Sequence, residues 1–234
     1  MSTESGIPDF RSPTGLWATV DPYEVASLES FRRDPERTWR FYGPRIAALR
    51  AAEPNAGHRA LAALEHAGLV QAVVTQNIDT LHARAGSREV VEVHGSIRSA
   101  RCLRCRLDVA LERLPVALEH GEAPRCEACD GVLKPGVVMF GELLPQREIE
   151  RATELARGAG VLLVVGSSLQ VWPVAGLPEE TLRRGGALAV LNREATPYDA
   201  EADLTLAAPA AETLAAVERM LLGQAARARA PGVL

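Results

Sequence analysis

Short apolar runs alternate along the chain with longer segments in which apolar residues recur every three or four positions. The runs predict strands at residues 69–75, 90–93, 161–165 and 187–191. The three-to-four spacing predicts helices at residues 35–53, 57–67, 146–157 and 210–222, and Asn55 is a suitable N-cap for the second helix. Strands that alternate with helices predict an α/β fold built from βα units around a mostly parallel sheet.

One interval breaks this alternation. Residues 95–135 have weak periodicity and carry all four cysteines, which predicts a small module inserted into the α/β core. Cys102 and Cys105 form one C-x-x-C turn, and Cys126 and Cys129 form a second after twenty intervening residues. This spacing is that of a zinc ribbon, and four sulfur ligands leave no open position for water, so we expect one structural Zn²⁺. The alternative, four buried or disulfide-linked cysteines, does not explain two paired turns.

Composition and charge narrow the class of protein. The chain has 234 residues, of which 47% are hydrophobic and 24% charged, which is typical of a soluble globular protein and excludes disordered and collagen-like chains. The net charge of −4 and the aromatic content of 4% disfavour a zinc-ribbon nucleic-acid binder. The basic residues include a single lysine, Lys134.

No segment of the sequence predicts a membrane span or a secretory signal. The longest uncharged stretch, residues 158–178, contains Ser167, Ser168, Gln170, Pro173 and four glycines, so we interpret it as a buried strand followed by a loop. The first twelve residues lack the basic and apolar regions of a signal peptide. We therefore expect a cytoplasmic protein with reduced cysteines.

Three predicted strands end in small or polar residues. The first is followed by Gln76, Asn77, Ile78 and Asp79, and the two later ones are followed by Gly166, Ser167 and Ser168, and by Asn192, Arg193 and Glu194. Such residues also build ordinary turns and caps. Their recurrence where open α/β sheets bind ligands favours a nucleotide crevice. His94, at the end of the strand predicted at residues 90–93, is a candidate proton acceptor.

Several segments, taken in order, resemble the sirtuin family. They are GIPDFRS at residues 6–12, TQNIDTLH at 75–82, EVHGS at 92–96, the paired C-x-x-C turns, VVMFGE at 137–142, GSSLQVWPVAGLP at 166–178 and LNRE at 191–194. The resemblance implies an NAD-dependent protein lysine deacylase with a Rossmann-like domain made of residues 1–19, 54–96 and 136–234. It also implies a small domain that combines a helical insert at 20–53 with the zinc-ribbon module at 97–135.

The resemblance also implies roles for individual residues. In sirtuins the acyl-lysine carbonyl oxygen attacks the nicotinamide ribose of NAD, nicotinamide leaves, and a histidine deprotonates a ribose hydroxyl, giving O-acyl-ADP-ribose. The match makes His94 this base and Asn77 a second catalytic residue. The implied NAD contacts are Gly6, Ile7, Pro8, Asp9, Phe10, Arg11, Trp17, Gln76, Asn77, Ile78, Asp79, Gly166, Ser167, Ser168, Asn192, Arg193, Glu194 and Ala210. The backbone of Val137, Val138, Met139, Phe140 and Gly141 is expected to receive the substrate of an acyl-lysine protein or peptide as an added strand.

A further match concerns the acyl group. Tyr42 and Arg45 resemble the Tyr-x-x-Arg pair of class III sirtuins, which binds the carboxylate of succinyl- or malonyl-lysine. A guanidinium pairs with a carboxylate through two charge-assisted hydrogen bonds. The alternative is an ordinary amphipathic helix with a surface arginine. The intervening Gly43 and Pro44 predict a break in the helix, so the pair is expected to converge by a bent route.

The sequence departs from the sirtuin pattern at its start. In the family a strand and a glycine-rich phosphate loop precede the segment ESGIPDFR, and of that loop only Ser2 is present here. We therefore expect the assigned start to lie downstream of the true one. The leading hypothesis is a monomeric deacylase with desuccinylase, demalonylase and residual deacetylase activity. Alternatives are a catalytically silent protein that binds acyl-lysine or ADP-ribose, and a nicotinamide oxidoreductase, which the absence of a GxGxxG after any strand disfavours.

Overall fold

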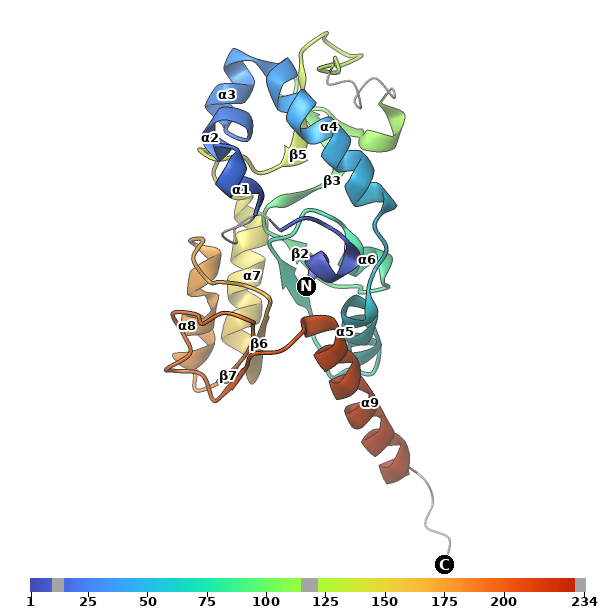
Figure 1. Cartoon of the computed structure of the whole chain (residues 1–234), viewed down its shortest axis with the longest axis vertical. Helices are drawn as coiled ribbons and strands as arrows, with labels where there is room; N and C mark the ends of the chain where they lie inside the picture. Colours follow the sequence, from blue (N-terminus) through green and yellow to red (C-terminus); the bar gives the residue numbers. More distant parts are fainter. Residues whose placement is uncertain (10–14, 115–121, 230–234) are drawn as a thin grey trace, which may run out of the picture.

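The parallel sheet of this α/β protein is in two parts. The computed structural model describes residues 1–9, 15–114 and 122–229 (Figure 1). β1 (Val73–Thr75) pairs with β2 (Val90–Glu92), with Val73 opposite Val90. β6 (Val161–Val165), β7 (Ala187–Leu191) and β8 (Leu204–Leu206) form the second part in that order. The predicted strands are confirmed, although the first is confined to the last three residues of its apolar run.

A three-stranded antiparallel sheet follows the parallel strands β1 and β2 in the chain. Its central strand β3 (Gly95–Cys102) lies between β4 (Asp108–Ala110) and β5 (Leu133–Val137). Gly95 has a φ of +68°, and a Cβ atom there would lie 2.2 Å from the Gly136 carbonyl oxygen. Only glycine therefore allows β3 and β5 to approach each other immediately after His94.

Long amphipathic helices pack against the parallel strands. α5 (Ala56–His66) and α9 (Ala210–Arg229) lie side by side, and α7 (Gln146–Gly158) packs beside α8 (Leu177–Leu182) (Figure 1). The N-cap prediction for α5 is confirmed, because Asn55 Oδ1 accepts hydrogen bonds from the backbone of Gly57 and His58 at 3.0 and 3.3 Å. Short 3₁₀ turns lie at Ser2–Ser5, Leu111–Arg113 and Val174–Gly176.

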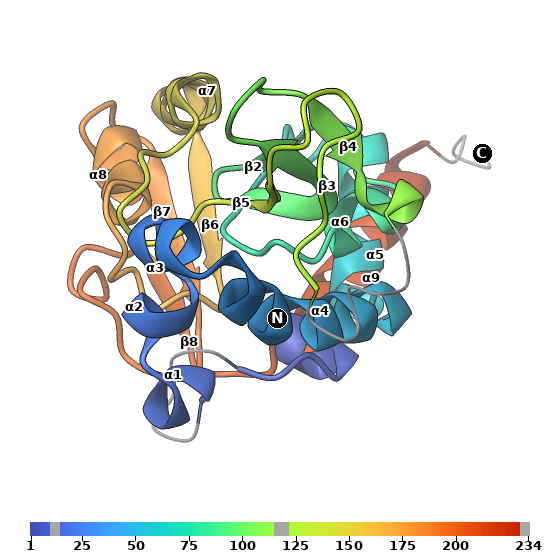
Figure 2. The same ribbon diagram turned by 90° about the horizontal axis from the view of Figure 1, so that it is seen from above.

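A separate group of helices covers the antiparallel sheet. Its members are α1 (Leu16–Thr19), α2 (Pro22–Val25), α3 (Leu28–Arg33) and α4 (Pro35–Ala51), while α6 (Leu81–Arg84) follows β1. Figure 2 shows this group on the opposite side of the molecule from α7. α4 runs through Pro44 without a break, which corrects the prediction of a bent route. Because Pro44 has no N–H, the carbonyl of Arg40 has no hydrogen-bond donor within the helix. Arg40 and Pro44 are both exposed, so water can donate to that carbonyl.

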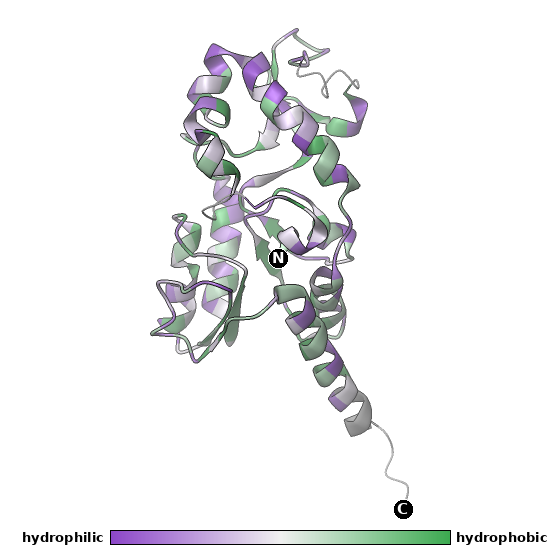
Figure 3. Ribbon diagram, in the orientation of Figure 1, coloured by the Kyte–Doolittle hydropathy of each residue, from purple (hydrophilic) through white to green (hydrophobic). Residues whose placement is uncertain are grey.

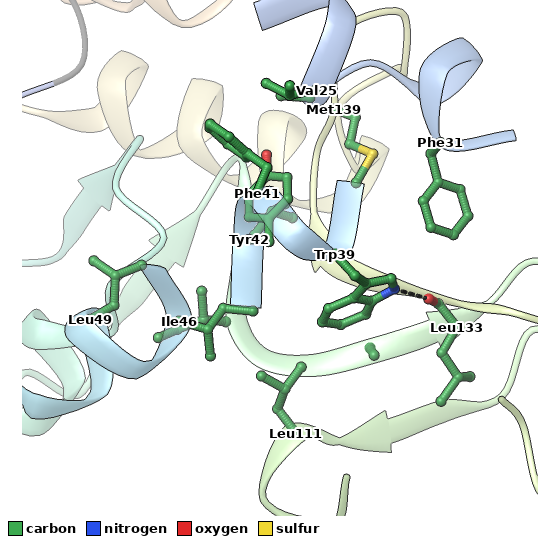
Figure 4. Packing of buried hydrophobic residues seen from close by; sticks show 14 of the residues in the cluster. Val25, Phe31, Trp39, Phe41, Tyr42, Ile46, Leu49, Leu111, Leu133 and Met139 are labelled. Carbon is green, nitrogen blue, oxygen red and sulfur yellow. Dashed lines mark hydrogen bonds between the residues drawn. The ribbon is translucent and has the colours of Figure 1, made fainter. Parts of the chain in front are cut away.

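The largest cluster of buried side chains joins α4 to the antiparallel sheet (Figure 4). Trp39 is fully buried, and its indole Nε1 donates a 2.8 Å hydrogen bond to the Leu133 carbonyl of β5. Cys102 and Cys126 belong to the same cluster. The helical group and the cysteine module therefore share one core, although residues 20–53 and 97–135 are separate in the sequence.

One face of the strands β6 to β8 is uncovered in the described residues. Val161 and Leu163 on β6 are 65% and 44% exposed, and Leu204 and Leu206 on β8 are 59% and 43% exposed. Figure 3 shows β6 in the green of hydrophobic residues. The pairing of Leu163 with Ala189, and of Ala189 with Leu204, places these residues in one apolar row. The prediction that residues 161–165 are a buried strand is therefore wrong for this face, because the helices α7 and α8 pack against the other side.

Among the residues that the structure describes, no helix combines the length and apolar character that crossing a membrane requires.

The Trp39 contact generates a stability prediction. Replacing Trp39 with Phe removes the hydrogen bond and leaves the buried Leu133 carbonyl without its partner. We expect the free energy of unfolding to fall by about 2 kcal/mol, measured by urea denaturation followed by circular dichroism. Arg40→Ala on the exposed side of the same helix is the control and changes stability by less than about 0.5 kcal/mol. Equal stability of the Trp39→Phe variant and the unmodified chain would contradict the assignment.

Candidate active site

A buried carboxylate organises the carboxyl end of β1. Asp79 is 3% exposed, and its Oδ2 accepts a 2.6 Å hydrogen bond from the Ser2 hydroxyl. Its Oδ1 accepts from the Leu81 backbone at 2.9 Å, at the start of α6. The exposed Asn77 donates from Nδ2 to the Ser2 oxygen at 2.8 Å. The predicted pair Asn77 and Asp79 is therefore linked through Ser2, which sequence analysis did not include among the site residues.

The first residues of the chain are tied to two helices of the α/β core. Asn55 Nδ2, at the start of α5, donates to the Met1 carbonyl at 3.2 Å and to the Ser5 hydroxyl at 3.0 Å. The Glu4 carboxylate accepts hydrogen bonds from the backbone of Ala210 and Ala211 at 3.2–3.3 Å. Glu4 thus caps α9. Its carboxylate is bonded to the N–H of the buried Ala210, a residue that we expected to contact NAD.

The carboxyl ends of β1 and β6 lie next to each other. Gln76 Nε2 donates to the Ser167 hydroxyl at 3.3 Å, and that hydroxyl also accepts from the Leu169 backbone at 3.2 Å. Gly166 has a φ of +57°, and a Cβ atom there would lie 2.7 Å from the Met1 nitrogen. Ser168 is half-buried beside this contact. The strand ends that the sequence grouped together therefore do converge here.

The residues after β7 form a more open part of the site. Asn192 Nδ2 donates to the Glu194 carbonyl at 2.8 Å, and the Asn192 backbone N–H donates to Leu206 on β8. Arg193 and Glu194 are exposed. Burial lowers the pKa of the N-terminal amine, and the positive charge of Arg193 lowers this pKa further. This loop therefore lies near Met1, at the same end of the sheet as Gly166.

His94 is held at the junction between β2 and β3. Its Nδ1 lies 3.1 Å from the Gln76 carbonyl oxygen, and its own carbonyl accepts a hydrogen bond from the Val138 N–H at 2.8 Å. A carbonyl can only accept, so Nδ1 carries the proton in the neutral ring and Nε2 is the basic nitrogen. The backbone of Gln76 therefore sets the tautomer that a general base requires.

Two buried histidines lie behind Asp79. His58 and His82 are in T-shaped contact with ring centroids 4.8 Å apart. His58 Nδ1 accepts a hydrogen bond from the Asn55 backbone at 3.2 Å, and burial lowers the pKa of His58 to about 3. Burial also lowers the pKa of His82, although the Asp79 carboxylate opposes this shift. Both rings are therefore neutral near pH 7.

Tyr42 and Arg45 lie on one face of α4. The Arg45 guanidinium stacks on the Phe41 ring, with Cζ 3.8 Å from the ring centroid, and Nη1 donates to the Phe41 carbonyl at 2.6 Å. Burial lowers the pKa of Arg45 and raises the pKa of the Tyr42 phenol, with a smaller contribution from Glu142 to the second shift. Tyr42 therefore keeps its proton and can donate a hydrogen bond, while Phe41 holds the guanidinium in a fixed orientation.

Several of the residues that we expected to contact NAD lie in residues 6–17, ahead of this helix in the chain. Trp17 stacks on Phe41 at 5.7 Å and makes an edge contact with Phe140 at 6.2 Å, so it lies beside the Tyr42 and Arg45 face. Ile7 is buried in the same core, and Gly6 and Pro8 are exposed next to it. Asp9 accepts a backbone hydrogen bond from Leu16. Phe10 and Arg11 lie outside the described residues.

The predicted substrate strand is largely paired within the protein. Phe140 exchanges backbone hydrogen bonds with Ala26 and Leu28, and Val138 donates to His94. Met139 N–H donates to the Glu142 carboxylate at 2.8 Å, and the Val137 carbonyl accepts from Lys134 Nζ at 2.6 Å. Much of the polar backbone of Val137, Val138, Met139 and Phe140 is therefore already bonded within the protein, and the addition of a substrate strand along this segment stays a prediction. Among the described residues, Gly141 is the member of this segment whose backbone makes no such bond.

The only lysine of the chain lies under this segment. Lys134 Nζ is buried, forms a 3.0 Å ion pair with Glu142 and donates to the carbonyls of Pro135 and Val137. Burial lowers the pKa of Lys134, and the Glu142 carboxylate counteracts that shift. The ion pair joins β5 to the turn after Phe140.

The four cysteines form one cluster. Their sulfur atoms all lie within 4.8 Å of one another, with Cys102 to Cys129 at 3.5 Å and Cys105 to Cys126 at 3.6 Å, and none is in a disulfide. Four thiolates around a tetrahedral Zn²⁺ require sulfur separations of about 3.8 Å. Backbone N–H groups of Cys105 and Arg104 lower the pKa of the Cys102 thiol, which favours the thiolate. The cluster therefore fits one structural zinc ion.

Comparison with known proteins agrees with this geometry. The profile of the Sir2 family matches residues 1–173. A protein of Caldivirga maquilingensis named NAD-dependent protein deacetylase is 47% identical over 215 residues, which are 92% of this chain and 82% of that protein. The NAD-dependent protein deacylase 1 of Archaeoglobus fulgidus is 41% identical over 214 residues, covering 92% of this chain and 86% of the relative.

Solved structures show the same likeness. A Sir2 homologue in complex with NAD superposes with a TM-score of 0.89 at 40% identity, covering 95% of this chain and 86% of that chain. The structure of Sir2Tm bound to a propionylated peptide gives a TM-score of 0.84 at 38% identity, covering 95% and 89%. The family profile spans well over half of this protein, and both the relatives and the structures cover nearly all of it. The chain therefore belongs to the Sir2 family.

Proposed function

We propose that this protein uses NAD to remove succinyl and malonyl groups, and acetyl groups more slowly, from lysines of proteins. Relatives named as NAD-dependent protein deacetylases and deacylases support the general activity. The observation that carries the finer assignment is the Tyr42 and Arg45 pair on one face of α4, with the guanidinium oriented by Phe41. An oriented guanidinium beside a phenol can bind a carboxylate, whereas an acetyl group would leave it unpaired.

The residues at the strand ends fit a dinucleotide in this proposal. Asn77, Asp79 and Ser2 form one hydrogen-bonded group, and Gln76 and Ser167 join the ends of β1 and β6. These donors and acceptors would hold the ribose and amide groups of NAD, whose bond between ribose and nicotinamide is the one that breaks. The site lies where residues 1–19, 54–96 and 136–234 meet residues 20–53, which we propose as the boundary between the large and the small domain.

His94 would remove the proton from a ribose hydroxyl. Its Nδ1 is bound to the Gln76 carbonyl, so Nε2 accepts the proton and the Gln76 dipole stabilises the resulting imidazolium. The Val138 N–H donates a hydrogen bond to the His94 carbonyl and so holds this base beside residues 137–141, the segment that we expect to bind the substrate. The products would be nicotinamide, O-acyl-ADP-ribose and the free lysine, with one water molecule consumed.

The first experiment measures nicotinamide release and peptide mass with succinyl-, malonyl- and acetyl-lysine peptides, with and without NAD. We expect NAD-dependent loss of all three groups, with the two acidic groups turned over fastest. His94→Ala should lower turnover at least about 100-fold, because a positioned base contributes that much or more. His66→Ala, an exposed histidine on α5, is the control and should retain activity. A fully active His94→Ala variant would exclude His94 as the base.

The carboxylate clamp has its own test. Arg45→Met keeps the length and apolar stem of the side chain but removes the charge. We expect kcat/KM for succinyl-lysine to fall about 10- to 100-fold while that for acetyl-lysine changes less than about twofold. Arg50→Met, one turn or more along the same helix, should leave both unchanged. Equal losses on the two substrates would contradict the clamp.

Zinc removal tests the role of the cysteine cluster. We expect one zinc per chain by atomic spectroscopy, retained by His94→Ala and lost by Cys126→Ala. Loss of zinc should expose the backbone amides of β3, β4 and β5 to hydrogen exchange, because the metal supplies much of the folding energy of such modules. Amides of β7 serve as the internal control, since that strand lies in another core. Unchanged protection of β3 after zinc loss would contradict a structural role.

A further inference from the structure

A groove of about 680 Å³ lies where three separate parts of the chain meet. Leu28 and Arg32 come from α3, Leu103, Arg104 and Arg106 come from the first cysteine turn, and the third wall is the segment 141–143. Its apolar surface comes from three leucines, of which Leu143 is 95% exposed. The hydrogen bond from the Leu28 N–H to the Phe140 carbonyl at 2.9 Å fixes α3 against the third wall.

The charge of this groove is not balanced. Three arginines line it, and its one carboxylate, Glu142, is held by the Lys134 ammonium and the Met139 N–H. Arg32 and Arg106 are exposed, and neither forms an ion pair or a side-chain hydrogen bond with the part of the chain that the structure describes. Glu29, three residues before Arg32 on α3, makes no ion pair with it.

The three arginines do not all have the same structural use. Arg104 Nη1 donates to the Cys129 carbonyl at 3.1 Å, so this side chain stabilises the cysteine cluster. Arg32 comes from a helix outside that cluster. Arg106 lines the groove from the first cysteine turn, where its φ is +66°. Arg32 and Arg106 are thus the two cations left to bind a partner.

The groove lies a few residues along the chain from the proposed reaction centre. Val138 is bonded to His94, and Leu143 follows five positions later, after a turn in which the Glu142 N–H donates to the Met139 carbonyl at 3.0 Å. Even a fully extended chain rises only about 3.3 Å per residue, so Leu143 lies within about 17 Å of Val138. A peptide whose acyl-lysine reaches His94 would bring residues within about five positions of that lysine to the arginines.

We propose that this groove binds acidic residues that flank the acyl-lysine, so that the protein prefers substrates in which Asp or Glu lies within five positions of the modified lysine. This inference rests on the proposed function for the position of the lysine. Carboxylates complement the unpaired guanidinium groups of Arg32 and Arg106, and the leucines accept the apolar parts of the peptide.

The test compares labelled acyl-lysine peptides that carry three Glu residues before or after the lysine with matched Gln peptides. Binding is measured by fluorescence anisotropy and turnover by nicotinamide release, at 50 and 500 mM salt. We expect at least about fivefold tighter binding of one acidic series at low salt, with the difference lost at high salt. The R32Q/R106Q double variant should bind the acidic and Gln peptides equally, with zinc content and turnover of the Gln peptides unchanged.

Arg33→Gln is the matched control, because it lies next to Arg32 on α3 and removes the same charge without lining the groove. It should retain the preference for acidic peptides. Equal binding of acidic and Gln peptides by the unmodified protein, or an equal preference in the R32Q/R106Q variant, would overturn the proposal. If no peptide is turned over but the acidic preference depends on Arg32 and Arg106, the groove assignment stands and the deacylase assignment fails.

Discussion

Burial of the Asp79 carboxylate is the constraint on which the arrangement of the candidate active site depends. A charge that is almost excluded from water must be surrounded by hydrogen-bond donors, and here they come from Ser2 and from the start of α6. Because Ser2 also receives the Asn77 amide, the same carboxylate fixes the first residues of the chain against β1. Those residues in turn reach α5 through Asn55 and α9 through Glu4. One buried charge thus connects the strand end, the chain start and two helices.

Lys134 has a comparable role in the segment that is bonded to His94. Its ammonium is bonded to the Val137 carbonyl and to Glu142, and Glu142 is bonded to Met139. Removing one member of such a buried group leaves another charge uncompensated, which costs more than the net stabilisation of the pair. The segment 137–141 is therefore held by backbone hydrogen bonds to His94, Ala26 and Leu28 and by this buried ion pair. Both the proposed base, His94, and the proposed acidic groove depend on that rigidity.

Features with a long repeat or a fixed spacing were predictable from the sequence. The helices α4, α5, α7 and α9, the strands β6 and β7 and the cysteine cluster have a period or a motif that does not depend on distant residues. The strand β8 and the helices α1 to α3 are too short to show a period. The contact between Ser2 and Asp79 joins residues 77 positions apart, and no local pattern encodes it. The apolar run of β6 indicates a strand, but a run of Val and Leu does not reveal whether another element covers each of its faces.

Because its single lysine is buried, this protein is a poor target for lysine acylation, the modification that we propose it removes from other proteins. Acyl donors modify exposed lysine ammonium groups, and the charge of a modified lysine is lost. Here 25 of the 26 basic side chains are arginine, and the remaining one, Lys134, is 4% exposed and bonded on several sides. Its surface therefore presents no lysine to acylate. Conditions that raise acylation across other proteins would leave the charge of this one, and the cations at its groove, unaltered.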